Sequence, residues 1–428
     1  MRASWMMLLF ALTNVVETFT FLRPRLPVFS PTHTLHSSSP LSSSPIVSTD
    51  EPEKTKPSWA AGGFVSDLVN ALIKVKPLFF LMKLGARQQL ISTAEKNGVP
   101  WRERAMTLEK KKDTLDRYYR SVFEDSIEYP EYYTQEFHAY DEGNLNWKAA
   151  YECEQATMSM ALRVWPTECL TPKAAQDRLR SSFIDSVSMY IDAIQEQSMK
   201  SSSPTPLSSA SLSKSKFPSM NSSNQKTSNM QRLVDEQEET ARRSSKNIKS
   251  IVDLGCSVGV STFYLAEAFP SSTILGIDLS PQFLAVAKER QWSYPVTSPV
   301  STNIEFLHCQ AEKMDSLVET GSKDLVTASF MFHELPQKAS CDILKEMYRI
   351  TAASGYGTVA ITDNNPKSPV IQNLPPPIFT LMKSTEPWSD EYYAFDLEQA
   401  MRQVGFVDVI TIDTDPRHRT VLGRKPVQ

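Results

Sequence analysis

Short apolar runs alternate with helical patterns from residue 247 to the C-terminus. The runs occupy residues 251–254, 273–278, 304–307, 324–330 and 356–362. Between the last two runs, Ile343, Met347 and Ile350 recur three or four positions apart, the spacing that places side chains on one face of a helix. Strands that alternate with helices predict a doubly wound α/β sheet whose strands are largely parallel.

Residues with strong capping preferences mark the ends of two helices in this region. Ser280 is placed to cap a helix N-terminus, and Pro281 follows at the first helical position, where its missing N–H costs no hydrogen bond. Asp396 is placed to start the last helix, and Gly405 is placed to end it. Residues 406–423 have the pattern of two strands joined by a proline-containing turn. We therefore expect a seven-stranded, Rossmann-like sheet whose last pair is antiparallel.

The chain before the predicted sheet is mostly helical in pattern. Residues 64–89 repeat apolar side chains three or four positions apart, and Pro77 is expected to kink or break this helix. Its lysines argue against a membrane span, which leaves a helix packed on its own domain or one lying on a bilayer surface as a peripheral contact. Residues 101–194 continue as helices around an aromatic-rich interruption at 128–147. Residues 198–229 are rich in serine and lack acidic side chains, which predicts a disordered segment.

The N-terminus has the pattern of a targeting presequence. A short apolar run follows Arg2 and has the form of a signal peptide, because it is too short to span a bilayer. Residues 18–49 lack acidic side chains and are rich in serine, threonine and proline. With Phe19 or Phe21 near the junction, the arrangement is similar to the bipartite presequences of chloroplasts of secondary origin, so we expect a plastid protein with a transit peptide. The secretory pathway is the alternative, but five scattered cysteines favour a reducing compartment.

These patterns divide the chain into four parts. They are a presequence at 1–57, a helical region at 58–196 that we expect to form a cap, a serine-rich disordered insertion at 197–246, and the α/β domain at 247–428. The net charge of −4 offers no basic surface for nucleic acid. Six histidines and five cysteines show no metal-ligand spacing, so no metal site is predicted. The pattern does not indicate an oligomeric state.

The segment IVDLGCSVG at residues 251–259 has the form of a first strand and its glycine turn. In a doubly wound sheet the ligand lies beyond the carboxyl ends of the central strands, next to this turn. A dinucleotide fingerprint aligned on Gly255 would need glycines at Ser257 and Val260, so the turn does not suit a pyrophosphate. A nicotinamide-dependent oxidoreductase is therefore disfavoured.

The spacing suits an adenine-bearing ligand that has no phosphate, such as S-adenosylmethionine. Asp253 can organise the turn and the ammonium group of the ligand, while Gly255 and Gly259 allow the backbone to approach it. Asp278 ends the second strand, where a carboxylate can accept hydrogen bonds from both ribose hydroxyls. Gln310 follows the third strand, where its amide can donate and accept at the adenine edge.

Four segments resemble motifs of the class I S-adenosylmethionine-dependent methyltransferases, namely IVDLGCSVGVST, ILGIDLSP, QAEKM and DLVTASFMFHELP. The resemblance covers about residues 248–412 and is nearest to a little-characterised plastid and cyanobacterial branch related to the ubiquinone and menaquinone C-methyltransferases. Ser257 stands where the family usually has glycine, and Gln310 stands where it usually has aspartate. The resemblance implies cofactor contacts at Asp253, Gly255, Cys256, Ser257, Gly259, Asp278, Leu279, Gln310, Ala311, Glu312 and Ser329.

Candidate catalytic residues lie at the carboxyl ends of the fourth and fifth strands. Methyl transfer from a sulfonium needs an oriented acceptor and, for some acceptors, a base. His333 and Glu334 directly follow the fourth strand, and Asp363 and Asn364 follow the fifth. His333 can serve as a general base for a phenol, enol or carboxyl group, or it can fix the loop through hydrogen bonds. Aromatic candidates for a lid, a substrate wall or the core are His138, Tyr140, Tyr392 and Tyr393.

We therefore expect an S-adenosylmethionine-dependent methyltransferase that acts on a small molecule in a plastid. The helical region and residues 365–395 are expected to cover the active site, and their apolar, aromatic character favours a hydrophobic acceptor. A quinone, a pigment precursor, an isoprenoid or a lipid-like acid would fit, and a polar metabolite is the main rival. Two alternatives stay open: a methyltransferase-fold protein that serves in assembly or regulation, and a protein methyltransferase.

Overall fold

The computed structural model describes residues 76–135, 140, 142–200, 248–374 and 386–427. The predicted presequence, most of the serine-rich insertion and His138 lie outside these residues, as does the part of the predicted helix that precedes Lys76. Within the described parts of the chain, no helix is both long enough and apolar enough to cross a bilayer.

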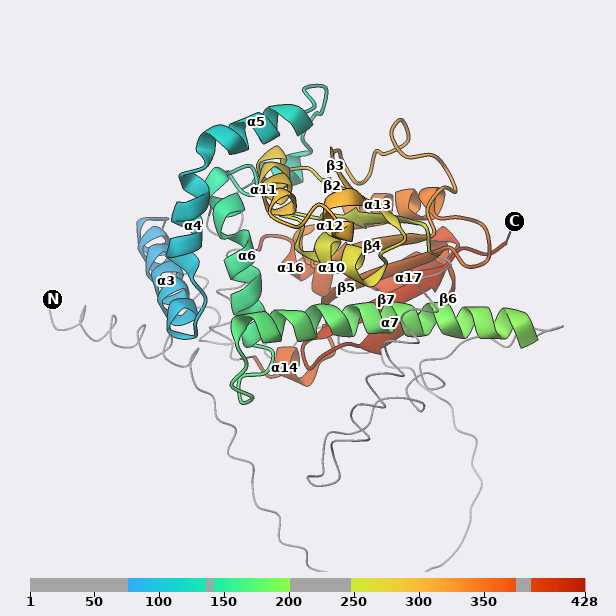
Figure 1. Cartoon of the computed structure of the whole chain (residues 1–428). Coiled ribbons are helices and arrows are strands. Elements are labelled where there is room, and N and C mark those ends of the chain that lie inside the picture. The colour runs from blue at the N-terminus through green and yellow to red at the C-terminus, as the bar shows by residue number, and fades with distance from the viewer. Residues whose placement is uncertain (1–75, 136–139, 141, 201–247, 375–385, 428) are drawn as a thin grey trace, which may run out of the picture.

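Seven strands form one sheet in the order β3-β2-β1-β4-β5-β7-β6 (Figure 1). Their bounds are β1 Ser250–Leu254, β2 Thr273–Asp278, β3 Ile304–His308, β4 Leu325–Ser329, β5 Thr358–Asn364, β6 Val407–Asp413 and β7 His418–Arg424. Strands β1 to β5 pair in parallel, and β7 runs antiparallel to both β5 and β6. The predicted doubly wound sheet with an antiparallel last pair is confirmed. Its strand order reverses between β1 and β4, which is where such sheets bind ligands.

Helices cover both faces of the sheet, as the alternation of strand and helix patterns predicts. The helices of the α/β domain are α10 Val260–Ala268, α11 Pro281–Trp292, α12 Pro299–Thr302, η3 Phe332–Glu334, α13 Gln337–Ile350, α14 Pro369–Gln372, α16 Ser389–Tyr393 and α17 Leu397–Val404. Alternate residues of β1 face opposite cores, since Ile251 packs with residues of α10 and α11, whereas Val252 and Leu254 pack with residues of α13 and α17. Both faces of the central strands are therefore buried, which is typical of parallel sheets.

The predicted helix caps are present. The hydroxyl of Ser280 accepts a hydrogen bond from the backbone N–H of Phe283 at 3.2 Å, and Pro281 opens α11. The carboxylate of Asp396 accepts from the N–H of Gln399 at 2.8 Å, and Gly405 ends α17 with a φ of 119°. These local signals fix the loop that follows β2 and both ends of α17.

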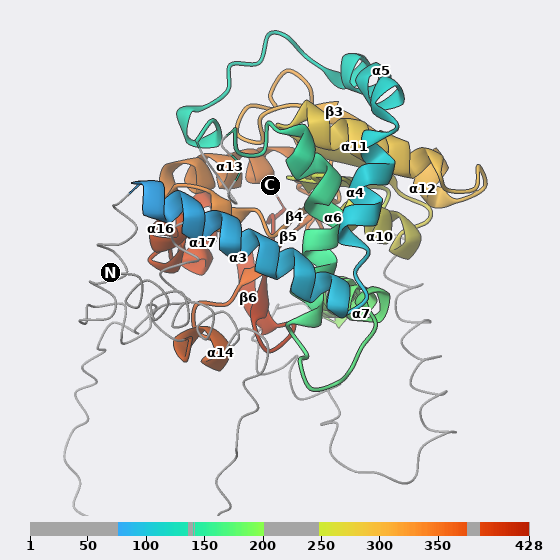
Figure 2. The ribbon, with the colours of Figure 1, turned by 90° about the vertical axis from the view of Figure 1, so that its left-hand side faces the viewer.

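Six helical segments precede the sheet in the part of the chain that the structure describes. They are α3 Lys76–Lys96, α4 Trp101–Glu109, α5 Lys112–Val122, η2 Glu131–Tyr133, α6 Trp147–Leu162 and α7 Pro172–Lys200. Pro77 is the second described residue of α3, so the predicted kink or break at this residue lies at the boundary of the described chain and stays a prediction. Helices α3 to α6 gather at one side of the sheet and face the viewer in Figure 2. The long helix α7 packs on one face of the sheet, where the hydroxyl of Tyr190 donates to the carbonyl of Asp408 at 2.9 Å.

Candidate cofactor site and active site

The turn after β1 is held together by a buried carboxylate. Asp253 is fully buried, and its oxygens accept hydrogen bonds from the hydroxyls of Ser261, Thr262 and Thr327 at 2.6, 2.7 and 2.9 Å. Ser261 and Thr262 belong to the first turn of α10, and Thr327 belongs to β4. The carboxylate therefore ties β1 to the two elements that flank the turn, which is the organising role expected of it.

Three residues of the turn adopt left-handed backbone conformations. The φ angles are 63° at Gly255, 51° at Ser257 and 79° at Gly259. Glycine adopts such angles without steric cost, whereas serine is uncommon there. The hydroxyl of Ser257 lies 3.1 Å from the thiol of Cys153 in α6, and its N–H donates to Asp278 at 2.8 Å. The serine that departs from the resembled family thus connects the turn to the helices that precede the sheet.

Gly259→Ala is expected to destabilise the protein by about 2 kcal/mol or more. An ideal Cβ at this position would lie 2.8 Å from the ring of Phe263 and 3.2 Å from the ring of Phe306, in a backbone conformation that alanine rarely adopts. The matched control is Gly85→Ala in α3, where a Cβ would meet nothing within 4 Å. This substitution should raise the free energy of unfolding by about 0.5–1 kcal/mol. Urea unfolding measures both changes, and equal effects of the two substitutions would contradict the prediction.

Asp278 points from the end of β2 back toward this turn. Its two oxygens accept the backbone N–H groups of Ser257 and Ser280, each at 2.8 Å, and the residue is 8% exposed. Burial raises the pKa of Asp278 to about 6, with a smaller contribution from Glu334 and partial compensation by the backbone N–H groups. Because each carboxylate oxygen has lone pairs beyond the one used by the backbone, two ribose hydroxyls can still be accepted.

A segment of the helical region closes over the ends of β2 and β3. The side-chain amide of Gln310 donates to the backbone carbonyl of Glu128, and the hydroxyl of Tyr132 donates to Glu312 at 2.7 Å. His308 is the last residue of β3, and its Nδ1 accepts the N–H of Glu124 at 3.0 Å. Its Nε2 lies 3.2 Å from the hydroxyl of Tyr129 and 3.1 Å from the carbonyl of Leu279. The segment that contains Glu128 and Tyr132 therefore contacts the side chains of Gln310 and Glu312, and the Gln310 amide expected at the adenine edge donates to Glu128 instead.

The remaining predicted cofactor positions line the same strand ends. Cys256 and Leu279 are buried, and Ala311 is partly buried against the core. Ser329 ends β4 as a buried residue, and its hydroxyl has no hydrogen-bond partner in the part of the chain that the structure describes. Buried hydroxyls in native proteins are normally paired, so this one is available to a ligand or an ordered water.

These residues fit an adenosine-bearing cofactor. An ideal Cβ on Gly255 would lie 2.7 Å from the sulfur of Met331, so the side chain of Met331 packs directly against the turn and a larger residue at this position would clash with it. The carboxylate of Asp278 and the unpartnered hydroxyl of Ser329 lie at the strand ends where the strand order reverses, and each would offer a polar atom to a bound ligand. Because acceptors rather than N–H donors dominate beyond β2, the site suits a ribose better than a pyrophosphate.

His333 and Asp363 form a buried pair beside this site. Nδ1 of His333 lies 2.8 Å from one carboxylate oxygen of Asp363, and the backbone N–H of His333 donates to the other at 3.1 Å. The structure extends β5 to Asn364, so Asp363 lies within the strand rather than after it. Glu334 accepts a hydrogen bond from Asn144 at 3.2 Å and therefore contacts the helical region. The sequence thus placed His333 and Asp363 at neighbouring strand ends, and the structure brings them into contact.

The charge of this pair decides what His333 can do. Burial alone lowers the pKa of His333, but the charge and hydrogen bond of Asp363, together with Glu386 and Glu334, outweigh it and raise the pKa to about 10. His333 is then protonated at neutral pH, and its Nδ1–H donates to Asp363. Its Nε2–H has no partner among the described residues, so it can donate to a bound molecule.

Aromatic residues surround the pair. Tyr392 and Tyr393 are buried in α16, and the ring of Tyr392 lies 6.3 Å from the imidazole of His333 in an edge-to-face arrangement. Tyr133 is partly buried, and burial together with the charges of Asp278 and Glu334 raises its pKa far above the usual range. Tyr140 instead donates to Glu152 within the helical region at 2.6 Å.

Several residues near the site were not predicted from the sequence. Cys153, Glu128 and Asn144 contact the strand ends from segments more than 100 positions away in the chain. Only the density of aromatic residues at 128–147 pointed toward this region, and no local pattern indicates which side chain meets which strand.

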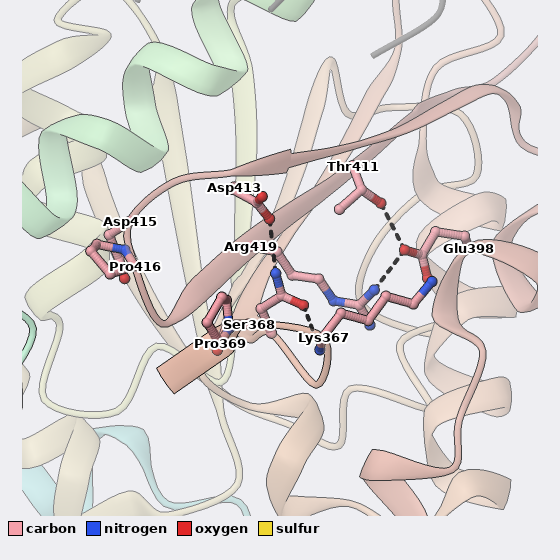
Figure 3. A pocket seen from close by; sticks show the side chains of 10 residues that line it. Lys367, Ser368, Pro369, Glu398, Thr411, Asp413, Asp415, Pro416 and Arg419 are labelled. Atoms are coloured by element: carbon pink, nitrogen blue, oxygen red, sulfur yellow. Dashed lines mark hydrogen bonds and ion pairs between the residues drawn. The ribbon is translucent and has the colours of Figure 1, made fainter. Parts of the chain in front are cut away.

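A cavity of about 500 Å³ lies at the other end of the same sheet edge, between α14 and the β6–β7 hairpin (Figure 3). Several of its polar side chains pair with one another, while Nε of Arg419 has no hydrogen-bond partner among the described residues. Glu398 accepts hydrogen bonds from Thr411 at 2.7 Å and from Arg419 at 2.6 Å. Asp413 accepts from Asn365 at 2.8 Å. The cavity is lined by a paired network and lies apart from the glycine turn, so it is not the candidate cofactor site.

Comparison with known proteins agrees with this geometry. Residues 251–355 match the family model described as a methyltransferase domain. The chain is 51% identical over 51 residues to the uncharacterized phycocyanin operon protein W of Pseudanabaena tenuis, which covers 12% of this chain and 48% of that protein. It is 32% identical over 123 residues to the chloroplastic tocopherol O-methyltransferase of Arabidopsis thaliana, covering 29% of this chain and 31% of that protein.

The chain thus spans about half the length of the first of these relatives and about a third of the second. A solved structure of a SAM-dependent methyltransferase from Aquifex aeolicus is similar over 44% of this chain and 88% of its own, with 18% identity and a TM-score of 0.32. The segment that matches the family model, residues 251–355, begins in β1 and contains the glycine turn, Asp278 and His333. Residues 251–355 are therefore similar to a methyltransferase domain, and the sheet order is the one predicted for such a domain.

Proposed function

We propose that this protein is an S-adenosylmethionine-dependent O-methyltransferase whose acceptor is a small, hydrophobic molecule with an acidic oxygen. The observation that carries the proposal is the buried contact of His333 with Asp363 at the carboxyl edge of the sheet, and this carboxylate raises the pKa of His333 to about 10. Methyl acceptors differ in whether they must lose a proton before they react, so the charge of this pair discriminates among them.

A protonated His333 cannot remove a proton from a neutral acceptor. It can instead donate a hydrogen bond from Nε2 to an oxygen that is already ionised, and Asp363 holds the ring in place through Nδ1. Carboxylates are ionised at neutral pH, as are strongly acidic enols and phenols. The pair therefore favours a carboxylate over a neutral phenol or an amine, and it acts by binding and orienting the acceptor.

When bound, the cofactor supplies an electrophilic methyl group, which an acceptor oxygen takes by in-line displacement of the thioether. The chain's contribution is to hold the two reactants in line. The glycine turn and Asp278 fix one side, and His333 fixes the acceptor oxygen on the other. The cap segment around Tyr132 closes over the strand ends and excludes water from the site.

The surroundings of His333 favour a hydrophobic body on the acceptor. Tyr392 and Tyr393 are buried in the core next to His333, so aromatic side chains back this end of the site. A plastid setting is supported by the pattern of residues 1–57 and by the likeness to a chloroplastic enzyme named for tocopherol, a hydrophobic molecule. We therefore place the proposed acid among lipid-like or isoprenoid metabolites of the plastid.

The test supplies the purified protein with cofactor that carries an isotopically labelled methyl group. Matched sets of hydrophobic carboxylic acids, phenols and amines on the same carbon skeleton serve as acceptors, and mass spectrometry identifies the product. We expect base-labile methyl esters of the acids. Labelled amines without esters would contradict the proposal. Cofactor binding with no labelled product from a chloroplast extract would favour the assembly or regulatory alternative, and labelled protein would favour a protein methyltransferase.

A further inference from the structure

One buried cation of the helical region has guanidinium nitrogens without hydrogen-bond partners. Arg180 lies in α7 and is only 6% exposed, yet Nε and Nη1 of its guanidinium have no hydrogen-bond partner among the residues that the structure describes. The neighbouring Arg178 differs, since it is more exposed and pairs with Glu168. Arg290, which is also close to the turn, donates to the carbonyl of Val258 and to Glu154 at 2.8 Å.

The guanidinium of Arg180 lies where the cofactor turn meets β4. Its central carbon is 5.2 Å from the ring centre of Phe330, the residue that directly follows Ser329. It also interacts electrostatically with Asp253 and Cys153, and Cys153 in turn contacts Ser257. Arg180 therefore reaches the ends of β1 and β4 from outside the α/β domain.

An unpaired guanidinium in such a place is costly. Burial lowers the pKa of Arg180, and buried charges in native proteins are normally paired and hydrogen-bonded. Asp253 does not complete the pairing, because its oxygens are occupied by three hydroxyls and it forms no ion pair with Arg180 in the described residues. A planar guanidinium with free N–H groups matches a carboxylate, which accepts two parallel hydrogen bonds.

We propose that Arg180 binds the α-carboxylate of the methionine part of S-adenosylmethionine. The inference rests on the proposed function, because it requires the cofactor to occupy the turn after β1. It assigns part of the cofactor site to α7, so the helical region is needed for binding as well as for covering the site. Arg180 would then distinguish the complete cofactor from analogues that lack the carboxylate.

The experiment compares two ligands on the full chain by calorimetric titration without an acceptor. S-adenosylmethionine carries the carboxylate, and decarboxylated S-adenosylmethionine lacks only that group. Arg180→Met should weaken the first by roughly 10- to 100-fold and leave the second unchanged within about twofold. Arg180→Lys, which keeps the charge but not the planar fork, should give a smaller loss of the same kind. Arg178→Met on the same helix is the control and should change neither affinity.

The possible results separate this inference from the proposed function. If the unsubstituted protein binds neither ligand, the cofactor assignment itself fails. If it binds S-adenosylmethionine and Arg180→Met weakens both ligands equally, or neither, Arg180 does not contact the carboxylate. An effect of Arg180→Met that appears only in the Michaelis constant of an acidic acceptor would place the guanidinium at the acceptor and would also overturn the inference. Circular dichroism establishes whether each variant is folded. If Arg180→Met does not fold, the two affinities of Arg180→Lys test the inference in its place.

Discussion

Asp278→Asn is expected to weaken the binding of S-adenosylhomocysteine by about 100-fold. Two ribose hydroxyls that donate to a carboxylate lose most of their contribution when the acceptor becomes a neutral amide. The amide nitrogen also cannot accept the N–H of Ser257 or Ser280, so one of these backbone groups loses its partner. Calorimetric titration at pH 7.5 measures the loss directly.

The same carboxylate should make binding depend on pH. Burial raises the pKa of Asp278 to about 6, so below this pH the free protein carries a protonated group that accepts poorly. Affinity for the cofactor should therefore fall as the pH drops through 6, approaching tenfold per pH unit, and Asp278→Asn should be nearly independent of pH over the same range. In the ligand-free protein the sign is opposite. The pKa of Asp278 is higher in the folded protein than in the unfolded chain, so ionisation of this group destabilises the folded protein. The free energy of unfolding should therefore decrease as the pH rises from about 4 to 6.

5′-Methylthioadenosine provides the control for this prediction. It keeps the ribose and adenine but lacks the amino-acid part of the cofactor, so Asp278→Asn should weaken it as much as it weakens S-adenosylhomocysteine. Arg180→Met should leave it unchanged. Unaltered binding of methylthioadenosine to Asp278→Asn would show that Asp278 supports the turn without contacting the ribose.

Local patterns were sufficient to predict the sheet. The run at 273–278 coincides with β2, and Ser280 caps α11 as its residue type predicts, because both features depend on a few consecutive residues. Strand β5 is longer than its apolar run. It continues through Asp363 and Asn364 because these residues pair with Arg419 and His418 of β7. Pairing between segments so distant in the chain cannot be predicted from the local pattern of apolar residues.

The same distinction explains which parts of the site were predictable. Asp278 and His333 follow strands directly, so the topology of a doubly wound sheet places them at one edge. The residues that close the site come from the helical region, and their contacts join positions as far apart as Gln310 and Glu128. Arg180 had no signal at all, since an arginine in an amphipathic helix is usually exposed.

Asp363→Asn is expected to reduce methyl transfer to the proposed acid by about 100-fold while leaving cofactor affinity unchanged. Without the carboxylate, burial becomes the dominant influence on His333, and its pKa should fall from about 10 toward or below its usual value near 6.5. The imidazole would then be neutral and free to rotate. It would lose both the charge and the orientation with which Nε2–H donates to an acceptor.

The control for this change is a carboxylate on the surface of α13. Asp342 accepts hydrogen bonds from Lys338 at 2.9 Å and from Lys345 at 2.8 Å, so Asp342→Asn should leave methyl transfer intact. The imidazole pKa values can be followed by nitrogen-15 chemical shifts. A rate for Asp363→Asn equal to that of the unsubstituted enzyme, with the pKa of His333 lowered, would mean that the protonated ring does not bind the acceptor.

Stability should report on the same pair independently of any acceptor. A histidine whose folded pKa is raised contributes stability that is fully present below about pH 6.5 and is lost as the pH rises through about 10. Unfolding free energies of the unsubstituted protein should therefore fall across this window, and those of Asp363→Asn should not show this fall. Breaking a buried pair by removing one partner costs about 3–5 kcal/mol, so Asp363→Ala should also be markedly less stable at pH 7. The unfolding free energies of the unsubstituted protein and of Asp363→Asn could instead change in parallel from pH 6.5 to 10. In that case His333 would be neutral at pH 7 and free to act as a base, and phenols would become the favoured acceptors.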